Sequence, residues 1–279
     1  MTQALNSKQI EDFKQQGYLA NLPIFSPTEM DQLNRELPNI LGLLKPGEST
    51  KEIREWHEAS RFLFDICMDK RILDYVESLL GAGFYMWASN FFIKEPHSME
   101  IVGWHQDAYY WPLCPIESLT VWVAFDDVDE QNGAMRVIPA SHRQGMVEHR
   151  RQEGDDSVLS LQADVSAFDP DAAVSVPLRR GSISIHDDKL LHASPGNASS
   201  RRRAGFTIRY SPNRVKCNLK INPHFRIFPA RGKICRINPL GKISTQRYGR
   251  LFREHQSIEE SGQKREKEFW VKKILGKGK

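Results

Sequence analysis

The sequence predicts a mainly β protein with flanking helices, built as a β-sandwich or barrel. After residue 83, short runs rich in aromatic and β-branched residues are separated by Gly, Pro, Asn and Asp, a pattern typical of short strands joined by turns. These strands do not alternate with helical segments, which argues against a doubly wound α/β sheet. The segment 1–82 instead carries apolar residues at helical spacing.

One helix in the segment 1–82 is well marked at both ends. Ser26 is a good N-cap, Pro27 suits the first helical position, and Glu29 completes a capping box. Because proline cannot continue a helix without losing a hydrogen bond, we expect this helix to stop at Pro38.

Further elements follow from periodicity and turn residues. The stretches 10–17 and 61–81 have helical spacing, and each closes at a glycine. We expect these helices to cover the β structure. Strands are expected in six runs: FYMWASNFFIKEP, LTVWVAFDDV, AMRVIPAS, AVSVPL, GSISIHD and RAGFTIRYSP.

Composition is that of an ordinary globular protein, with 279 residues, 27% of them charged, and a net charge of +4. No apolar run is long enough to span a bilayer, and the N-terminus lacks a signal-peptide core. No nucleic-acid motif is present, so neither membrane nor nucleic-acid binding is expected. Four cysteines lie far apart with no C-x-x-C pair, which favours a cytoplasmic location: Cys67, Cys114, Cys217 and Cys235.

A candidate metal site begins in the segment 103–115, GWHQDAYYWPLCP. In an extended strand, residues i and i+2 point to the same face, so His105 and Asp107 can converge on one point. Two interpretations follow. The pair could supply two ligands of a metal ion, or it could be a surface His–Asp hydrogen bond, which is the commoner outcome for an isolated H-x-D.

A third ligand is needed for a metal site, and the best candidate is His192 in SISIHDDKLLHASPGNASSRRRAGFTIRY. Two histidines and one carboxylate on one face of a metal, with open positions opposite, are the ligand set of non-heme Fe(II) oxygenases. The same segment holds a rival set, because His186 and Asp188 form a second H-x-D six residues before His192.

The sequence resembles the phytanoyl-CoA dioxygenase family of Fe(II)/2-oxoglutarate-dependent oxygenases. The matching stretches are WHQD, LTVWVAFDDVDEQNGAMRVIPASHRQG and LLHASPGNASSRRRAGFTIRY, and the match runs from about residue 7 to about residue 212. The resemblance implies a double-stranded β-helix, a cupin-like jelly roll. We therefore expect one oxygenase domain over 1–279, with helical cladding at 1–82, a jelly-roll core at 83–212 and a C-terminal extension at 213–279.

The resemblance also assigns the principal site residues. The iron ligands correspond to His105, Asp107 and His192, which disfavours the set around His186. The family's arginine, which binds the far carboxylate of 2-oxoglutarate, corresponds to Arg203, eleven residues after His192. An arginine suits this role because it is always charged and binds a carboxylate through two parallel hydrogen bonds.

Three further residues are expected to contact the co-substrate or to wall the pocket. Ser194 can add a hydroxyl hydrogen bond to the same carboxylate. Asn90 resembles the family's amide that bonds 2-oxoglutarate, and Trp111 matches a family aromatic near the iron. The expected cofactors are Fe(II), 2-oxoglutarate as co-substrate, and O₂.

The implied reaction is hydroxylation of an unactivated C–H bond, with 2-oxoglutarate converted to succinate and CO₂. Related halogenases replace the carboxylate by a small residue, so Asp107 favours hydroxylation. Two alternatives stay open: a catalytically inactive jelly-roll binding or sensor protein, and a cupin metalloenzyme that does not use 2-oxoglutarate.

The substrate is expected to be a small molecule. Arg201 and Arg202 lie next to Arg203 in sequence; they could form a solvated turn or could help to hold an anionic substrate, whereas the aromatic DAYYW could face an ammonium group. A zwitterion such as a 2-aminoalkylphosphonate fits both hints.

The end of the chain, SIEESGQKREKEFWVKKILGKGK, places Phe269, Trp270 and Ile274 in an apolar stripe at helical spacing. We expect a helix that docks on the jelly roll or across a homodimer contact, rather than on a membrane.

Overall fold

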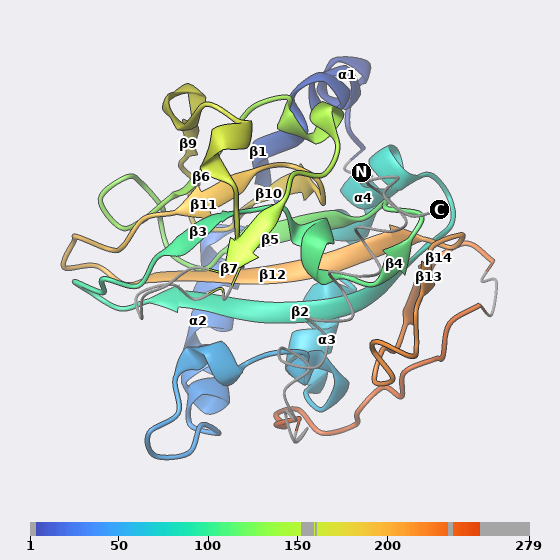
Figure 1. The fold of residues 1–279 in the computed structure, drawn as a ribbon. Coiled ribbons are helices and arrows are strands. Elements are labelled where there is room, and N and C mark those ends of the chain that lie inside the picture. Colours follow the sequence, from blue (N-terminus) through green and yellow to red (C-terminus); the bar gives the residue numbers. More distant parts are fainter. Residues whose placement is uncertain (1–3, 152–158, 160, 234–236, 252–279) are drawn as a thin grey trace.

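The computed structural model describes residues 4–151, 159, 161–233 and 237–251, and its core is formed by two antiparallel β-sheets (Figure 1). The larger sheet has six strands in the order β1-β10-β5-β12-β2-β14, and the smaller sheet has four in the order β3-β11-β6-β9. The neighbouring strands in both sheets are antiparallel. The architecture is a jelly roll, and the predicted fold class is confirmed.

All six predicted strand runs are found, as β2, β5, β6, β9, β10 and β12. The larger sheet comprises β1 (Tyr18–Pro23), β2 (Phe84–Lys94), β5 (Leu119–Ala124), β10 (Ser182–Asp187), β12 (Arg203–Pro212) and β14 (Phe228–Arg231). The smaller sheet comprises β3 (Val102–His105), β6 (Met135–Val137), β9 (Val174–Val176) and β11 (His192–Ser194). Two short pairs stand apart: β4 (Leu113–Cys114) with β13 (Lys216–Cys217), and β7 (His149–Arg151) with β8 (Leu161–Ala163).

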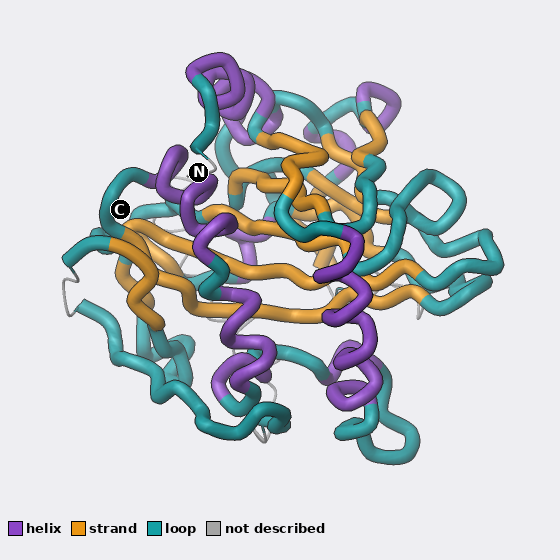
Figure 2. Tube along the Cα trace, turned by 180° about the vertical axis from the view of Figure 1, so that it is seen from behind, coloured by secondary structure: helices purple, strands orange, loops and turns teal. Residues whose placement is uncertain are grey.

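The outer face of the larger sheet is covered by helices (Figure 2). Leu37, Leu63 and Val76 from these helices share one buried cluster with Val121 and Phe206 of the sheet. The α-helices are α1 (Ser7–Gln16), α2 (Pro27–Leu41), α3 (Arg61–Cys67) and α4 (Lys70–Leu80). The 3-10 turns are η1 (Thr50–Glu52), η2 (Trp56–Glu58), η3 (Asp107–Tyr110), η4 (Ser141–Gln144), η5 (Val165–Ala167) and η6 (Pro170–Ala172).

Helix α2 begins as predicted, because the capping box between Ser26 and Glu29 is formed. It does not stop at Pro38, however, and continues to residue 41, so that prediction was wrong. The last turn carries Ile40, which is fully buried, as is Leu37 in the turn before. Burying such side chains contributes about 1.5–3 kcal/mol each, enough to offset much of the roughly 3 kcal/mol cost of a proline inside a helix.

The stretch 61–81 forms two helices rather than one. Asp69 interrupts it, and its side chain caps α4 by accepting a hydrogen bond from the backbone N–H of Arg71. Gly81 follows α4 as expected. Gly17 follows α1 in the left-handed conformation, with φ of 83°, which only glycine adopts without strain.

Strand β12 contributes side chains to both faces of the larger sheet. Because side chains alternate along a strand, its even-numbered residues, such as Phe206 and Ile208, face the helices and are fully buried. Its odd-numbered residues Arg203, Thr207 and Arg209 face the other way and line a cavity. A single strand thereby supplies both the hydrophobic core and part of the candidate site.

The larger sheet is not confined to 83–212. Strand β1 comes from the segment 1–82, and β14 comes from the segment 213–279. The helix expected around Phe269 and Trp270 lies outside the described residues.

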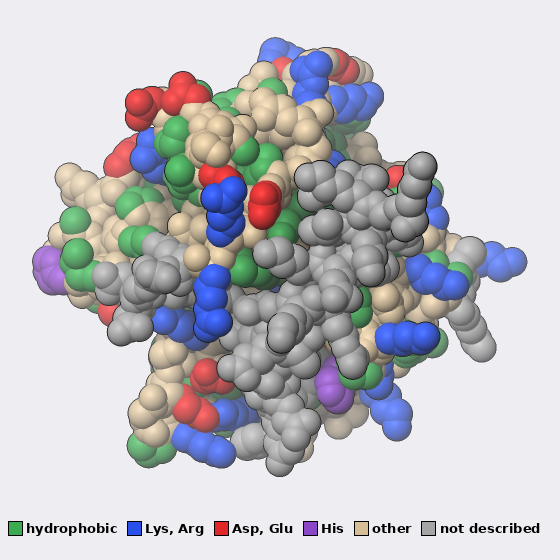
Figure 3. All heavy atoms as spheres, viewed as in Figure 1, with side chains coloured by type: hydrophobic (Ala, Val, Ile, Leu, Met, Phe, Trp, Pro, Cys, Tyr) green, Lys and Arg blue, Asp and Glu red, His purple; other side chains and the backbone are tan. Residues whose placement is uncertain are grey.

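Within the described part of the chain, no helix combines the length and apolar character needed to cross a bilayer. On the face drawn in Figure 3, the visible Lys and Arg side chains lie in several separate groups, some with Asp or Glu beside them.

Candidate active site

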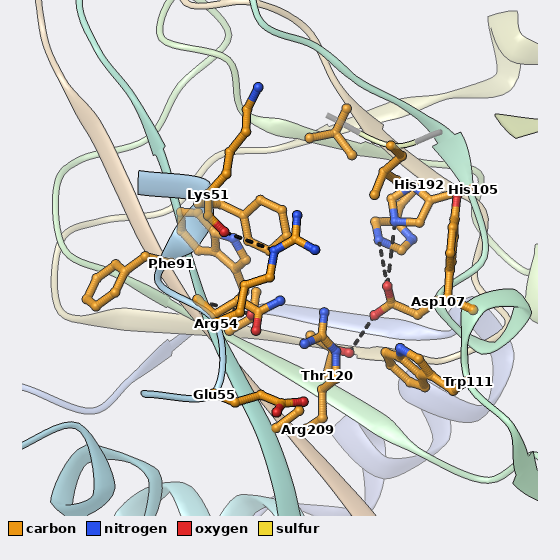
Figure 4. A pocket seen from close by; sticks show the side chains of 18 of the residues that line it. Lys51, Arg54, Glu55, Phe91, His105, Asp107, Trp111, Thr120, His192 and Arg209 are labelled. Atoms are coloured by element: carbon orange, nitrogen blue, oxygen red, sulfur yellow. Dashed lines mark hydrogen bonds and ion pairs between the residues drawn. The ribbon is translucent and has the colours of Figure 1, made fainter. Parts of the chain in front are cut away.

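A cavity of about 580 Å³ lies between the two sheets. Its walls come from both sheets, mainly β2, β5, β11 and β12, and from the loop 50–55. Figure 4 shows that His105, Asp107 and His192 gather at one side of it, and that Arg54 and Lys51 lie across from them.

The three residues predicted as iron ligands converge. Their candidate ligand atoms all lie within 4.8 Å of one another, and all three side chains are buried. Nε2 of His105 lies 3.5 Å from Oδ1 of Asp107, and Nε2 of His192 lies 3.9 Å from the same oxygen. His105 and His192 are directly opposite each other in the antiparallel pair β3–β11, which brings their ring centroids to 4.0 Å.

The geometry of the H-x-D pair differs in one detail from the expectation. Strand β3 ends at His105, and Asp107 is the first residue of the 3-10 turn η3. The two side chains still converge because Gln106 between them keeps an extended backbone, with φ of −114° and ψ of 125°. The two side chains therefore lie on the same face, as they would in a strand, although the extended backbone ends at Gln106.

Gln106, which lies between the two candidate ligands, is fully buried, and hydrogen bonds hold its side chain and its backbone N–H in place. Its amide nitrogen donates to the carbonyls of Gly145 and Lys189, and its amide oxygen accepts from the backbone N–H of Val147. Its own backbone N–H donates to Nε2 of His149 at 3.0 Å. Burial lowers the pKa of His149 to about 3, so this ring stays neutral and keeps its acceptor. These contacts fix the backbone that carries the two candidate ligands.

Both candidate histidine ligands have a defined tautomer. Nδ1 of His105 lies 2.8 Å from the carbonyl of Gly103, and Nδ1 of His192 lies 2.9 Å from the carbonyl of Leu190. A carbonyl only accepts, so each Nδ1 carries the proton and each Nε2 presents its lone pair toward Asp107. Burial, followed by the neighbouring imidazoles, lowers the pKa of His192 well below its usual value. Neutral imidazole is the form that binds a metal.

Asp107 is held as a carboxylate. The hydroxyl of Thr120 donates to its Oδ2 at 2.7 Å. Burial alone would raise the pKa of Asp107, but the neighbouring imidazoles of His105 and His186 and the charge of Arg209 lower it well below the usual range. The cluster therefore offers one charged oxygen and two neutral nitrogens.

Arg203 lies in the same cavity and is buried. Among the residues that the structure describes, its Nε and Nη2 have no hydrogen-bond partner. Burial lowers the pKa of Arg203 to about 10, which leaves it charged at neutral pH. The guanidinium lies 5.5 Å from the ring centroid of Trp122, and Gly205 leaves the space that this indole fills. A buried, charged donor without a partner is suited to an anionic ligand.

Lys94 is a second cation beside Arg203, directly opposite it in the β2–β12 pair. Its ammonium group donates to the backbone carbonyls of Ser194 and Pro195. Burial, with a further contribution from the charge of Arg203, lowers the pKa of Lys94 to about 7 despite the opposing effect of Glu100.

The remaining predicted site residues, Ser194, Asn90 and Trp111, all line the cavity. Ser194 is buried on β11 two residues after His192, and Asn90 lies on β2 opposite Thr207. The ring of Trp111 packs edge-on against that of Trp87, with centroids 4.9 Å apart.

The rival histidine set does not form. His186 lines the cavity, and its Nε2 lies 3.6 Å from Oδ2 of Asp107. The carboxylate of Asp188 instead accepts the backbone N–H of Ser118, while its backbone carbonyl accepts that of Ala108. Asp188 thus positions the turn that carries Asp107 rather than binding beside His186.

Arg201 and Arg202, which suggested an anionic substrate, do not line the cavity. Arg201 pairs with Asp129 at 2.6 Å, and Arg202 makes two hydrogen bonds to Asp126. That interpretation was wrong because both guanidinium groups are committed to acidic side chains of the loop after β5.

Other arginines take their place. Arg54 and Arg209 line the cavity, and neither was identified from the sequence. Arg209 could have been found, because it lies six residues after Arg203 on one strand and therefore on the same face. Nothing in the local sequence marks Arg54, which reaches the cavity from the loop 50–55 only after folding.

A jelly roll that brings two neutral histidines and a carboxylate together in a buried cavity has the ligand set of the non-heme Fe(II) oxygenases. Comparison with known proteins agrees. Residues 13–205 match the family model described as phytanoyl-CoA dioxygenase. The chain belongs to this family, and it is an Fe(II)- and 2-oxoglutarate-dependent oxygenase.

The sequence identity to individual relatives is low. A probable α-ketoglutarate-dependent hypophosphite dioxygenase of Stutzerimonas stutzeri is 27% identical over 74% of this chain and 78% of its own length. The peroxisomal phytanoyl-CoA dioxygenase of Rattus norvegicus is 24% identical over 55% of this chain and 47% of its own. L-proline trans-4-hydroxylase of Streptomyces griseoviridis is 28% identical over 52% of this chain and 60% of its own. The match thus spans about half the length of the last two relatives.

Solved structures support the fold. The apo form of the non-heme monooxygenase ThoJ aligns with a TM-score of 0.71 at 24% identity, over 96% of this chain and 99% of that one. CytC3 with Fe(II) and α-ketoglutarate aligns with a TM-score of 0.66 at 22% identity, over 91% and 98%.

Proposed function

We propose that His105, Asp107 and His192 hold Fe(II) and that Arg203 binds the far carboxylate of 2-oxoglutarate. One observation carries this proposal. The same cavity holds two Nε2 atoms that face a carboxylate, and a buried guanidinium whose Nε and Nη2 have no hydrogen-bond partner among the described residues. The ligand set fits iron because imidazole and carboxylate are the donors that non-heme Fe(II) sites use. The guanidinium fits a dicarboxylate because it offers two parallel donors.

When bound, iron and 2-oxoglutarate supply the oxidation: O₂ is split, 2-oxoglutarate is converted to succinate and CO₂, and the second oxygen atom enters a C–H bond of the substrate, or a P–H bond where the substrate is a phosphorus oxyanion without carbon. The chain binds and orients these groups. Thr120 and the anchored Gln106 hold Asp107 in position, and the ring of Trp122 packs against the guanidinium of Arg203. The buried position of the cluster excludes water from the reacting atoms.

The proposed substrate is a small anionic or zwitterionic metabolite, for example a 2-aminoalkylphosphonate or a simpler phosphorus oxyanion. Arg54 and Arg209 in the cavity support an anionic group. The name of the Stutzerimonas relative, a hypophosphite dioxygenase, supports phosphorus chemistry. The aromatic side chains of Trp111 and Tyr110 would suit an ammonium group. We place the reaction in the cytoplasm, consistent with the widely spaced cysteines.

The test is a succinate-release screen with Fe(II), 2-oxoglutarate and O₂ over a panel of phosphonates, phosphite, hypophosphite, amino acids and acyl-CoA esters. Release above the substrate-free rate, with a product 16 mass units heavier, is the result expected for insertion of one oxygen atom. A protein that binds iron and 2-oxoglutarate but turns over none of these compounds would contradict the proposed substrate class. A protein that does not bind 2-oxoglutarate would contradict the function itself.

Replacing Thr120 by valine is expected to weaken Fe(II) binding about 10- to 100-fold, because partners that orient a metal ligand typically contribute this much. The substitution removes the hydroxyl that donates to Asp107 but keeps the shape of the side chain. Thr207→Val is the matched control, since that hydroxyl donates to the carbonyl of Asn90 instead. Titration with Fe(II) under anaerobic conditions measures both, and equal affinities would show that Thr120 does not position Asp107.

The affinity for 2-oxoglutarate is expected to fall as pH rises above about 7. Below this pH the ammonium group of Lys94, whose pKa is lowered to about 7 by burial, is charged and adds to the attraction of Arg203 for a carboxylate. Above it, binding the dianion requires uptake of a proton, so affinity declines with pH. Isothermal titration across this range tests it. Lys94→Met should remove the pH dependence, and a slope that persists in this variant would assign it to another group.

A further inference from the structure

A second buried guanidinium, that of Arg209, lies in the cavity apart from Arg203. Both side chains project from the same face of β12, and six residues of strand separate them by roughly 20 Å along the backbone. Figure 4 shows Arg209 between Glu55 and Asp107. A single small dianion that binds Arg203 and the histidine–carboxylate cluster therefore leaves Arg209 available for another group.

The surroundings of Arg209 indicate that its charge lacks a partner. It is 8% exposed, and its Nε has no hydrogen-bond partner within the described ranges. Burial lowers the pKa of Arg209, and the charges of Asp107 and Glu55 only partly offset this effect. No carboxylate of the described residues lies within ion-pair distance of it, and its guanidinium instead lies 5.0 Å from the ring centroid of Trp111. A buried cation in such a place is costly unless an anion completes it.

Arg54 supplies a second cation from the opposite wall. Its Nε donates to the carbonyl of Lys51 at 2.9 Å, which holds the guanidinium in place and leaves its two terminal nitrogens for a ligand. Figure 4 shows Arg54 reaching toward the cavity. Lys51 itself is committed, because its ammonium group pairs with Glu100 at 2.8 Å.

The loop that carries Arg54 is fixed. Glu55 has a φ of 57°, a conformation that non-glycine residues rarely adopt, and its backbone N–H donates to the carbonyl of Ser89 on β2 at 2.6 Å. Strained backbone of this kind persists where the surrounding structure holds it, and it is frequent at functional sites.

We propose that Arg209 and Arg54 form a second anion-binding subsite, which takes the anionic group of the primary substrate while Arg203 takes 2-oxoglutarate. This inference rests on the proposed function and names the part of the substrate that is recognised. The ligand would carry a carboxylate or a phosphorus oxyanion at one end. The rest of the molecule would pack on the aromatic wall of Trp111 and Trp87, with its C–H bonds toward the candidate iron ligands.

The test uses full-length protein loaded with Mn(II), which replaces Fe(II) without turnover, and saturated with 2-oxoglutarate. Methylphosphonate and propionate are titrated into it by calorimetry, and 2-oxoglutarate is titrated separately into the Mn(II) protein. The variants are Arg209→Gln and Arg54→Gln. The control is Arg136→Gln, an exposed arginine on β6 outside the cavity. Thermal melting checks that each variant folds. Arg54 lies in a partly exposed loop, so its variant carries the test if Arg209→Gln does not fold.

We expect the wild type to bind at least one of the two probes, and the probe that binds more tightly identifies the anion as phosphonate or carboxylate. Arg209→Gln and Arg54→Gln should each weaken that probe by about thirty-fold or more, because one partner of a buried charge pair is lost. Arg136→Gln should bind it as the wild type does.

Two results would overturn the subsite. One is a wild type, saturated with 2-oxoglutarate, that binds neither probe. The other is an Arg209→Gln variant that loses affinity for 2-oxoglutarate and keeps the probe, which would assign Arg209 to the co-substrate. Failure of the wild type to bind 2-oxoglutarate at all would be a different outcome, since it contradicts the proposed function and not the subsite alone.

Discussion

Replacing either His105 or His192 by alanine is expected to abolish 2-oxoglutarate turnover and to remove bound iron, while the protein stays folded. Each histidine presents its Nε2 lone pair to Oδ1 of Asp107, at 3.5 Å and 3.9 Å. Losing one leaves one imidazole and the carboxylate, which no longer form the set of two histidines and one carboxylate that holds Fe(II) with open positions for co-substrate and O₂. Neither side chain belongs to the hydrophobic cluster between the helices and the larger sheet or to the cluster that joins the two sheets. Iron content after anaerobic reconstitution, succinate release and thermal melting measure the three effects.

The matched control is His142→Ala. The ring of His142 lies outside the cavity and contacts the carbonyl of Lys14, so iron binding and turnover should be unchanged. Full iron content and activity in either ligand variant would contradict the assignment. His186 would then be the next ligand to test, because its ring nitrogens have no hydrogen-bond partner in the described part of the chain and its Nε2 lies 3.6 Å from Asp107.

Those parts of the site that depend on short sequence separation could be predicted. The H-x-D pair lies within three residues, and Arg203 follows His192 by eleven residues, at the start of the next strand. The family resemblance covers both. The alternation along β12 also places Arg203 and Arg209 on one face. Strand positions were predictable because aromatic and β-branched runs end at clear turn residues.

What could not be predicted depends on contacts between distant parts of the chain. Gln106 is anchored by backbone groups about 40 and 80 residues away, and nothing near it in sequence shows this. Arg202 has a suitable position in sequence, but it pairs with Asp126 at 2.9 Å and does not line the cavity. For Pro38, local propensity favours a stop, whereas burial of Ile40 against the sheet favours one more helical turn. In each case tertiary packing decides between locally reasonable alternatives.

Replacing Arg203 by alanine is expected to raise the KM for 2-oxoglutarate strongly. Losing one partner of a buried, charge-assisted pair costs about 2–5 kcal/mol, which corresponds to roughly thirty-fold to a few thousand-fold. Arg203 is buried and its Nε and Nη2 have no hydrogen-bond partner among the described residues, so both donors are available to the carboxylate and are lost in the alanine variant. Initial rates of succinate release against 2-oxoglutarate concentration give KM and kcat separately.

Two further variants make the result specific to the guanidinium. Arg203→Lys keeps a positive charge but loses the two parallel donors, so its KM should lie between those of the wild type and Arg203→Ala. Arg202→Ala removes the adjacent arginine, which pairs with Asp126 outside the cavity, and should leave the KM as it is. An Arg203→Ala variant with the wild-type KM would transfer the carboxylate to Lys94, the other buried cation at this end of the cavity. In that case the KM would instead rise in Lys94→Met, and it would rise most below the pH at which Lys94 loses its proton, because there the wild type carries a charge that the variant lacks.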